Sequence, residues 1–366
     1  MRGNPAIATS GNNVGRLSES RAIQVPATEA ELNHSNMRTE CMMVGSRVVQ
    51  SYRRALAAPM QAAAWWSAAI GTLSVLLGTP LVVLAQSMAP QIEAWSSPTL
   101  KRIEATGIVR LGYRENSPPF AFLDAKGKPI GYSLDLCEVV VEQIARELGK
   151  EVSVEYRAVT PENRFELVAS GAIDLECGST TNTADRRKIV AFSPTMFVTG
   201  TKLLVRRGSG IRSLRDLEGK TIVLTRGTVQ EAMVPKMTAR QNVAVKFMFA
   251  ADHNESFRAL SEGKADAFAN DDVQLYGMLA ETRSASDFRV VGDFLSYADY
   301  ALSLRKDDPE FAEIVDNAFH RLAGSREIVA IYERWFTRPL PSGARLNLPM
   351  SPHLEEIFRV QGLPGD

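Results

Sequence analysis

Arginines at the ends of predicted strands and loops are the side chains of this sequence best suited to binding chemistry. Arg114 follows the apolar strand predicted over Ile108–Tyr113, and Arg164, Arg186 and Arg226 stand at similar junctions. Basic residues in a first helical turn oppose the helix dipole, so helix stability does not explain them. A guanidinium binds a planar carboxylate through two parallel hydrogen bonds. Any one of these residues reads as surface arginine, but several meeting at one cleft would form a carboxylate site.

Hydroxyl groups stand directly before one of these arginines. The stretch Glu176–Ser193 reads ECGSTTNTADRRKIVAFS, with Ser179 and Thr181 ahead of Arg186. In the second half of the chain, Thr228 begins the pattern Thr-Val-Gln-Glu, a capping box at a helix start. Thr228 therefore reads as a helix cap, although a helix N-terminus behind Gly227 would also offer N–H groups to an anion.

Two further side chains complete the candidate set. Asp271 is followed by Asp272, and one of these acids could pair with an ammonium group; capping the next helix is an equally good interpretation. A single histidine such as His253 is more often an ordinary buried or exposed side chain than a ligand-binding one. The four histidines are scattered at 34, 253, 320 and 353, so no metal site is predicted, and no glycine-rich phosphate loop or other cofactor motif is present.

These residues must be positioned by alternating strands and helices. Strands are predicted over Ile108–Tyr113 and Val152–Tyr156. A helix is predicted over Leu134–Leu148, and Thr160-Pro161 resembles the start of a helix over Glu162–Ser170. The apolar face of the first helix comprises Cys137, Val140, Val141, Ile144 and Leu148. Such alternation predicts an α/β fold, with helices covering a mainly parallel sheet.

A weak internal repeat pairs the two halves. Leu167–Ser179 and Leu260–Asp272 both contain a helix end, then Gly-x-x-Asp, then a hydrophobic strand. Five residues beyond each of these aspartates the chain reaches Ser179 and Asp271. Two similar lobes would place both at carboxyl ends of strands, where open α/β sheets bind ligands. The motif is common, so the repeat only indicates this arrangement.

Composition narrows the function classes. The 366 residues carry 42 basic and 42 acidic side chains. After position 85, 35 basic and 38 acidic residues remain, which provides no electrostatic footprint for nucleic acid. The length allows two domains.

Residues 1–85 have the features of an N-terminal region that directs export. Residues 1–61 lack periodicity and are expected to be a disordered or mis-annotated extension. Residues 62–85 are uncharged and apolar, with Arg53 and Arg54 upstream, and end in Val-Leu-Ala, the layout of a secretory signal peptide. An uncleaved membrane anchor is the alternative, and cleavage is favoured because Gly71, Thr79 and Pro80 weaken a spanning helix. Cys137 and Cys177 would remain in an oxidising compartment, and we predict a disulfide between them.

From about Leu100 to Phe358 the chain resembles the periplasmic solute-binding proteins of polar amino-acid ABC transporters, solute-binding protein family 3. It is most similar to the glutamate/aspartate-binding branch. The matching stretches are Gly112–Glu115, Gly131–Ser133, Asn163-Arg164, Glu176–Asn182, Ala191–Ser193, Phe197–Thr201, Thr225–Thr228, Asp252-His253 with Ser256–Arg258, Asp271-Asp272, Leu304–Pro309 and Trp335-Phe336.

This resemblance implies a type II two-lobed clamshell of mixed, mainly parallel sheets, with crossover strands near Val198–Thr201 and Tyr297–Ala301. Lobe 1 would comprise residues 97–199 plus 298–366, and lobe 2 residues 200–297. It also implies roles for single residues. Arg186, with Ser179 and Thr181, would hold a ligand α-carboxylate, and Asp271 would pair with the α-ammonium. The side-chain carboxylate would face Arg114, Arg164 and His253, with Thr225 and Thr228 adding hydrogen bonds.

The function implied is capture of glutamate or aspartate in the periplasm by a monomer, without cofactor, for delivery to ABC permease subunits. The residues agree, because several arginines and one aspartate match two carboxylates and one ammonium, and a neutral amino acid would leave a guanidinium unpaired. Pro161 and Arg226 depart from the branch pattern at positions where small hydroxyl residues are usual. The alternatives are a clamshell enzyme such as a dehydratase, which needs a poised acid or base, and an amino-acid sensor.

Overall fold

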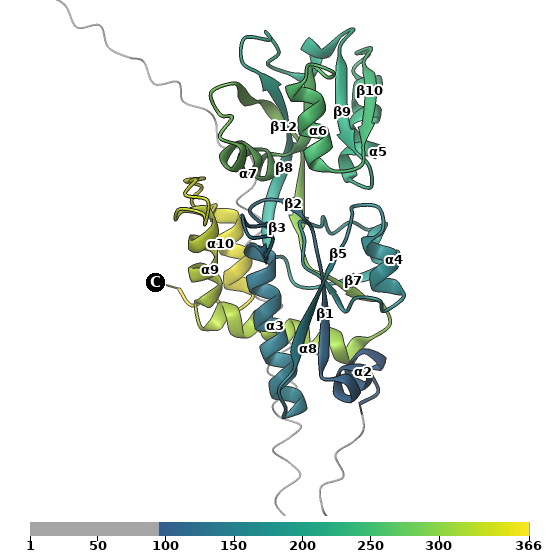
Figure 1. The fold of residues 1–366 in the computed structure, drawn as a ribbon, viewed down its shortest axis with the longest axis vertical. Coiled ribbons are helices and arrows are strands. Elements are labelled where there is room, and N and C mark those ends of the chain that lie inside the picture. The colour runs from purple at the N-terminus through teal and green to yellow at the C-terminus, as the bar shows by residue number, and fades with distance from the viewer. Residues whose placement is uncertain (1–94, 366) are drawn as a thin grey trace, which may run out of the picture. The chain divides into compact units, whose positions relative to one another are not determined.

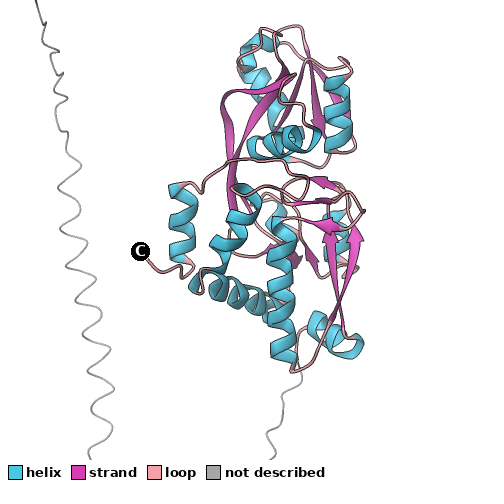
Figure 2. Ribbon diagram, turned by 60° about the vertical axis from the view of Figure 1, so that its left-hand side comes forward, coloured by secondary structure: helices cyan, strands magenta, loops and turns pink. Residues whose placement is uncertain are grey.

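The computed structural model of this chain describes residues 95–365. The extension predicted over 1–61 and the signal peptide predicted over 62–85 lie outside these residues. Within 95–365, helices and strands alternate as the sequence predicts, and they form two lobes, each built on a five-stranded sheet (Figures 1 and 2).

The first sheet has the strand order β5-β1-β6-β13-β7. Its strands are β5 (Ser153–Ala158), β1 (Ile108–Tyr113), β6 (Leu175–Glu176), β13 (Ser303–Arg305) and β7 (Val190–Phe192). Strand β1 runs parallel to β5 and β6, whereas β13 is antiparallel to its two neighbours. Around it lie α2 (Pro98–Thr106), α3 (Tyr132–Leu148), α4 (Arg164–Ala169), α8 (Pro309–Gly324), α9 (Glu327–Phe336), α10 (Pro352–Val360) and a small sheet of β2 (Asn116–Ser117), β3 (Ala121–Leu123) and β4 (Pro129–Ile130).

The second sheet has the order β10-β9-β11-β8-β12. Its strands are β10 (Lys246–Ala250), β9 (Thr221–Thr225), β11 (Ala267–Asp271), β8 (Phe197–Arg206) and β12 (Phe288–Tyr300). Helices α5 (Val229–Arg240), α6 (His253–Ser261) and α7 (Asp272–Thr282) lie beside it. Consecutive residues of β8, such as Leu203 and Leu204, point to opposite faces and enter two different apolar clusters, so both faces of this sheet are buried.

Two long strands join the lobes. Strand β8 enters the second sheet at one end, and the last residues of β12 return toward β13 of the first sheet (Figure 1). Residues 197–201 of β8 pair antiparallel with residues 296–300 of β12, and these ranges include the predicted crossover segments except Ala301. The prediction of a two-lobed fold with two crossover strands is therefore confirmed.

Most predicted elements match the structure. Strand β1 has its predicted bounds, and α3 begins two residues before the predicted helix at Leu134. The helix predicted over Glu162–Ser170 is shorter than expected and begins at Arg164. The reason is a turn in which the Asn163 and Thr160 side chains each accept the other's backbone N–H, at 2.8 and 3.2 Å.

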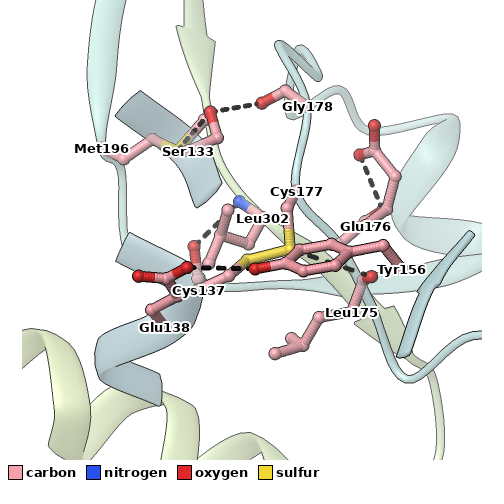
Figure 3. The surroundings of a disulfide bond; sticks show 12 residues. Ser133, Cys137, Glu138, Tyr156, Leu175, Glu176, Cys177, Gly178, Met196 and Leu302 are labelled. Carbon is pink, nitrogen blue, oxygen red and sulfur yellow. Dashed lines mark hydrogen bonds between the residues drawn. A yellow bond between two sulfur atoms is a disulfide. The ribbon is translucent and has the colours of Figure 1, made fainter. Parts of the chain in front are cut away.

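A disulfide ties α3 to the end of β6. Cys137 and Cys177, the predicted pair, have an S–S distance of 2.10 Å, and both are fully buried (Figure 3). The Ser133 hydroxyl donates to the carbonyl of Gly178 at 2.8 Å. The loop after β6 is thereby held against α3 at two neighbouring points, which positions the hydroxyl residues that follow. Separately, none of the helices in residues 95–365 has the length and apolarity needed to span a bilayer.

Candidate functional site

The repeated Gly-x-x-Asp motif has the same structural role in both lobes. Gly171 and Gly263 have φ of 73° and 75°, a left-handed conformation that glycine adopts without strain. Asp174 then accepts the backbone N–H of Arg110 at 2.7 Å, and Asp266 accepts that of Thr221 at 2.8 Å. Each aspartate thus fixes a strand to its parallel neighbour, and both strands deliver their carboxyl ends to one cavity.

This cavity lies between the lobes and has an empty volume of about 250 Å³. Its lining is almost wholly polar and comprises Arg114, Arg164, Ser179, Thr181, Arg186, Thr228, Val229, Gln230, His253, Asn270, Asp271 and Gln274. Eight of the nine predicted ligand-binding residues are in this lining; Thr225 is not.

Three guanidinium groups enter the cavity from elements around the first sheet. Arg114 follows β1, Arg164 begins α4, and Arg186 begins a 3₁₀ turn at residues 186–188. The ring of Phe165 lies 4.8 Å from the guanidinium carbon of Arg164 and 5.1 Å from that of Arg186. The ring supports both groups by cation–π contact without using their N–H donors.

Burial makes these charges costly. Burial, with the nearby Arg164 charge, lowers the pKa of both Arg114 and Arg186 to about 9, and burial lowers the pKa of Arg164 itself. All three stay protonated at neutral pH. The lowered pKa values indicate that these charges are incompletely compensated, so an added anion would stabilise them.

The arginine donors are only partly used by the protein. Arg164 Nη2 and Arg186 Nη2 both donate to the carbonyl of Gly227 in the opposite lobe, at 3.3 and 3.2 Å. Arg186 Nη1 donates to the Thr181 carbonyl at 2.9 Å. Arg164 Nε is buried and has no partner among the described residues. A carboxylate would supply the missing acceptors.

Asp271 faces the arginines from the second sheet. It occupies the position before α7, yet its side chain makes no capping hydrogen bond. Its Oδ1 accepts from Thr201 at 3.0 Å and Gln230 at 2.8 Å, and its Oδ2 accepts from the Tyr300 hydroxyl at 2.5 Å. Three donors leave one of about four acceptor positions on the carboxylate. Burial raises its pKa, so an ammonium partner would relieve a real cost.

No side chain caps the start of α7, so the helix-capping interpretation is wrong for both acids; Asp272, the first residue of the helix, has a structural role instead. Its Oδ1 accepts the backbone N–H of Val273 at 2.8 Å and the Thr199 hydroxyl at 2.7 Å. The two adjacent acids are therefore divided between a cavity role and a structural role.

His253 is a neutral side chain of the cavity wall. It is 2% exposed, and burial together with Arg114 and Arg164 lowers its pKa well below the ordinary value. Its Nδ1 lies 3.0 Å from the hydroxyl of Thr225, which is itself 2.7 Å from that of Ser256. Thr225 thus lies behind His253 and orients it.

The predicted capping box at Thr228 is wrong. The Glu231 carboxylate accepts the N–H of Gly227 at 2.8 Å rather than that of Thr228, and Thr228 makes no side-chain cap. The Thr228 hydroxyl donates instead to the Thr225 carbonyl at 2.6 Å. Because no side chain caps the start of α5, residues 228–230 can line the cavity.

Arg226 lies outside the cavity lining. Its guanidinium carbon is 5.3 Å from the centre of the Phe249 ring, and its side chain is 49% exposed. From the sequence, any one of the four arginines could be an ordinary surface residue. Arg226 is the one that is.

Three amide side chains of the lining were not predicted from the sequence: Gln230, Asn270 and Gln274. Gln274 Nε2 donates to the Ser179 hydroxyl at 2.5 Å, a hydrogen bond between the lobes. Gln230 and Gln274 stand in the first turns of α5 and α7, directly after the strand ends of the second sheet. This position, directly after strand ends, is the feature of the sequence from which their place in the site could have been predicted.

A larger and mostly apolar hollow, with an empty volume of about 910 Å³, lies beside the crossover strands. Its lining includes Phe197, Tyr297 and Tyr332 and contains no arginine. The smaller cavity is the candidate binding site because the charged side chains converge there.

The lobes touch closely at two glycines. A Cβ on Gly227 would lie 2.6 Å from the carbonyl oxygen of Pro161, and one on Gly277 would lie 2.2 Å from that of Pro118. Both pairs join opposite lobes, so the described conformation is closed.

Comparisons with known proteins agree with this architecture. Residues 109–338 match the model of the bacterial extracellular solute-binding proteins, family 3. The chain is 41% identical to the L-glutamate/L-aspartate-binding protein of Pseudomonas aeruginosa, over 77% of this chain and 94% of that one. It is 36% identical to the glutamate/aspartate import solute-binding protein of Escherichia coli K12, over 71% and 87% of the two chains.

Solved structures show the same fold. An ancestral arginine-binding protein bound to glutamine superimposes with a TM-score of 0.57 at 29% identity, covering 63% of this chain and 99% of that one. The holo form of ArgBP from T. maritima has a TM-score of 0.55 at 27% identity, with 64% and 98% covered. The chain belongs to family 3 of the bacterial extracellular solute-binding proteins.

Proposed function

We propose that this protein is the substrate-binding component of an ABC importer and captures glutamate or aspartate for a membrane permease. The observation that carries the proposal is the convergence of three guanidinium groups, those of Arg114 and Arg164 buried and that of Arg186 partly buried, on a small cavity opposite the buried Asp271 carboxylate. The names of the two relatives reported above support the same ligand class.

Each charged group of an acidic amino acid has a partner of opposite charge in this cavity. Arg186, with the Ser179 and Thr181 hydroxyls, receives the α-carboxylate. Asp271 receives the α-ammonium through its remaining acceptor position. The cavity arginines Arg114 and Arg164 face the side-chain carboxylate.

The neutral groups of the cavity have supporting roles. His253 also faces the side-chain carboxylate, and Thr228 adds a polar contact from the second lobe. Thr225, which lies behind His253, acts through that ring rather than on the ligand.

The ligand can be buried because each of its charges is paired with an opposite charge of the protein. Removing an ion from water costs several kcal/mol when it has no partner in the protein. An acidic amino acid leaves neither of its carboxylates nor its ammonium unpaired. Glutamine would leave a guanidinium without an anion, so it is expected to bind much more weakly.

We further propose that the protein binds its ligand without converting it. Burial and the nearby arginines hold the pKa of His253 well below its ordinary value, and Asp271 already accepts three hydrogen bonds. Neither is poised to exchange protons near neutral pH, as a general acid or base must.

Export and assembly complete the proposal. Residues 62–85 would direct the chain to the periplasm and be cleaved, and the mature protein would act as a monomer. Lobe 1 would span 97–199 plus 298–366 and lobe 2 would span 200–297, because β8 and β12 cross between the sheets.

Isothermal titration calorimetry of the purified protein tests the ligand. We expect tight binding of glutamate and aspartate, and at least 100-fold weaker binding of glutamine and arginine. Equal or tighter binding of a neutral or basic amino acid would refute the ligand assignment. Formation of a new compound during incubation with glutamate would refute the non-enzymatic role.

A further inference from the structure

A buried carboxylate that sequence analysis did not assign to the site lies next to it. Glu176 ends β6 and is fully buried. Its Oε2 accepts from the Ser303 hydroxyl at 3.3 Å, and its Oε1 has no hydrogen-bond partner among the described residues. Burying an incompletely hydrogen-bonded carboxylate costs free energy of folding, so we infer that Glu176 is compensated by nearby positive charge.

The position of Glu176 places this charge beside the arginines. A Cβ on Gly178 would lie 2.2 Å from Glu176 Oε1 and 3.1 Å from Arg114 Cγ. The carboxylate and the Arg114 side chain therefore approach the same glycine, and any larger residue there would displace one of them. Because Ser303 is the side chain that bonds Glu176, the arginine donors remain available for a ligand.

The charge of Glu176 acts on the whole arginine cluster. It raises the pKa of Arg114, Arg164 and Arg186, opposing the effect of burial on all three. Its influence therefore reaches both proposed carboxylate positions.

The charges that line the cavity, together with the fully buried Glu176 beside them, give the site a net charge. Three guanidinium groups stand against the two carboxylates of Glu176 and Asp271, while His253 is neutral. Asp252 and Asp272 lie outside the cavity lining, and both accept backbone N–H groups at helix starts. Asp252 also raises the pKa of Arg114, but, unlike Glu176, it is partly exposed to water, which screens its charge. The net charge is +1.

We propose that Glu176 is a specificity-determining counterion, which sets the cavity at one positive charge so that it selects ligands with one net negative charge. This inference rests on the proposed function and sharpens it. An acidic amino acid carries two negative groups and one positive, and it brings the closed cavity to neutrality. Glutamine leaves a positive charge in excess, and a dicarboxylate without an amine leaves a negative one. In a dehydrated cavity either imbalance weakens binding.

The test replaces Glu176 by its neutral isostere. Glu176→Gln raises the net charge of the cavity to +2, which matches glutarate, a dianion, better than glutamate. Calorimetry at neutral pH with glutamate, glutarate and glutamine gives three affinities for each protein. We expect the ratio of glutarate to glutamate affinity to rise at least tenfold in the variant. The matched control is Glu138→Gln, which removes an exposed carboxylate of α3 and should leave the ratio unchanged.

The outcomes separate the hypotheses. A purely structural role for Glu176 would weaken all three ligands by the same factor, and an unchanged ratio would overturn the inference while leaving the proposed function intact. Failure of the wild-type protein to bind glutamate or aspartate would remove the proposed function itself. If Glu176→Gln does not fold, Glu176→Asp draws the carboxylate back by one methylene and should raise the ratio about threefold; no rise there would also overturn the inference.

Discussion

Arg186 of the first lobe donates a hydrogen bond from Nη2 to the carbonyl of Gly227 in the second lobe, at 3.2 Å. The same carbonyl accepts from Arg164 Nη2 at 3.3 Å. Two guanidinium groups thus share one neutral oxygen across the cleft. A carboxylate would be a better acceptor for both, because it adds the attraction of a full negative charge, whereas the carbonyl offers only a dipole.

Replacing Arg186 by alanine should abolish most of the affinity for acidic amino acids. The α-carboxylate would lose its charged partner, a loss of roughly 2–5 kcal/mol for a buried pair, or about 30-fold to several thousand-fold in affinity. Calorimetry with glutamate measures it. Arg226→Ala is the matched control, because Arg226 lies at the surface, and it should bind like wild type. Near-wild-type affinity in Arg186→Ala would contradict the assignment.

Replacing Asp271 by asparagine should discriminate between ligands with and without an amine. Asparagine keeps the size of the side chain but loses the negative charge opposite the α-ammonium. Glutamate affinity should fall at least 30-fold, whereas glutarate should be little affected or bind more tightly. Calorimetry with both ligands checks this. Equal losses would argue against an ammonium partner at Asp271.

Binding should weaken in acid because of Asp271. Burial holds the pKa of Asp271 above its ordinary value of about 3.9. The ionised form pairs with the ammonium, so affinity is complete above this raised pKa and falls as pH drops through it. His253 is already neutral and should add no break near pH 6.5.

The pH dependence is measured by titrating aspartate into the protein from about pH 7.5 to 4.5. Asp271→Asn is the control. As pH falls, its affinity should decrease only where the ligand's own carboxyl groups become protonated, without the earlier decrease that protonation of Asp271 causes in the wild-type protein. A change in affinity centred on pH 6.5 would show that a different group, such as His253, controls binding.

Closure can be tested without touching a ligand contact. Gly277 lies within α7, and a Cβ there would be 2.2 Å from the Pro118 oxygen of the other lobe. Gly277→Ala should raise helix stability by up to about 1 kcal/mol, yet it should oppose closure and so weaken glutamate binding. Small-angle X-ray scattering should then show incomplete compaction at ligand concentrations that close the wild-type protein.

The control for this variant is another helical glycine. A Cβ on Gly324, at the end of α8, would meet nothing nearer than 3.9 Å. Gly324→Ala should leave binding and compaction unchanged. If Gly277→Ala behaved the same way, the described contact would not limit closure.

Local patterns predicted the elements well, and errors arose where side chains of neighbouring turns competed. The bounds of β1 and the buried face of α3 follow from periodicity, which local sequence carries. At Thr160 the helix start is displaced by reciprocal bonds with Asn163, and at Thr228 Glu231 bonds one residue earlier than a capping box requires. Both are choices between adjacent backbone donors, which spacing alone does not resolve.

The candidate site was recoverable only in part. Charged residues at strand ends drew attention because charge there is unusual, whereas the amides Gln230 and Gln274 carry no such signal. Glu176 was overlooked since a glutamate at a strand end is unremarkable until its full burial is known.

By itself, the sequence determined an α/β chain of two related halves, its family, and a set of arginines and acids placed at strand ends. Only the tertiary structure decided which of these share a cavity. Arg186 and Arg226 look alike in sequence, but one packs on Phe165 inside the cleft and the other on Phe249 at the surface. Asp271 and Asp272 are likewise separated by the partners that each one meets. The physical reason is that side-chain direction and burial depend on contacts with distant segments, which local patterns do not encode.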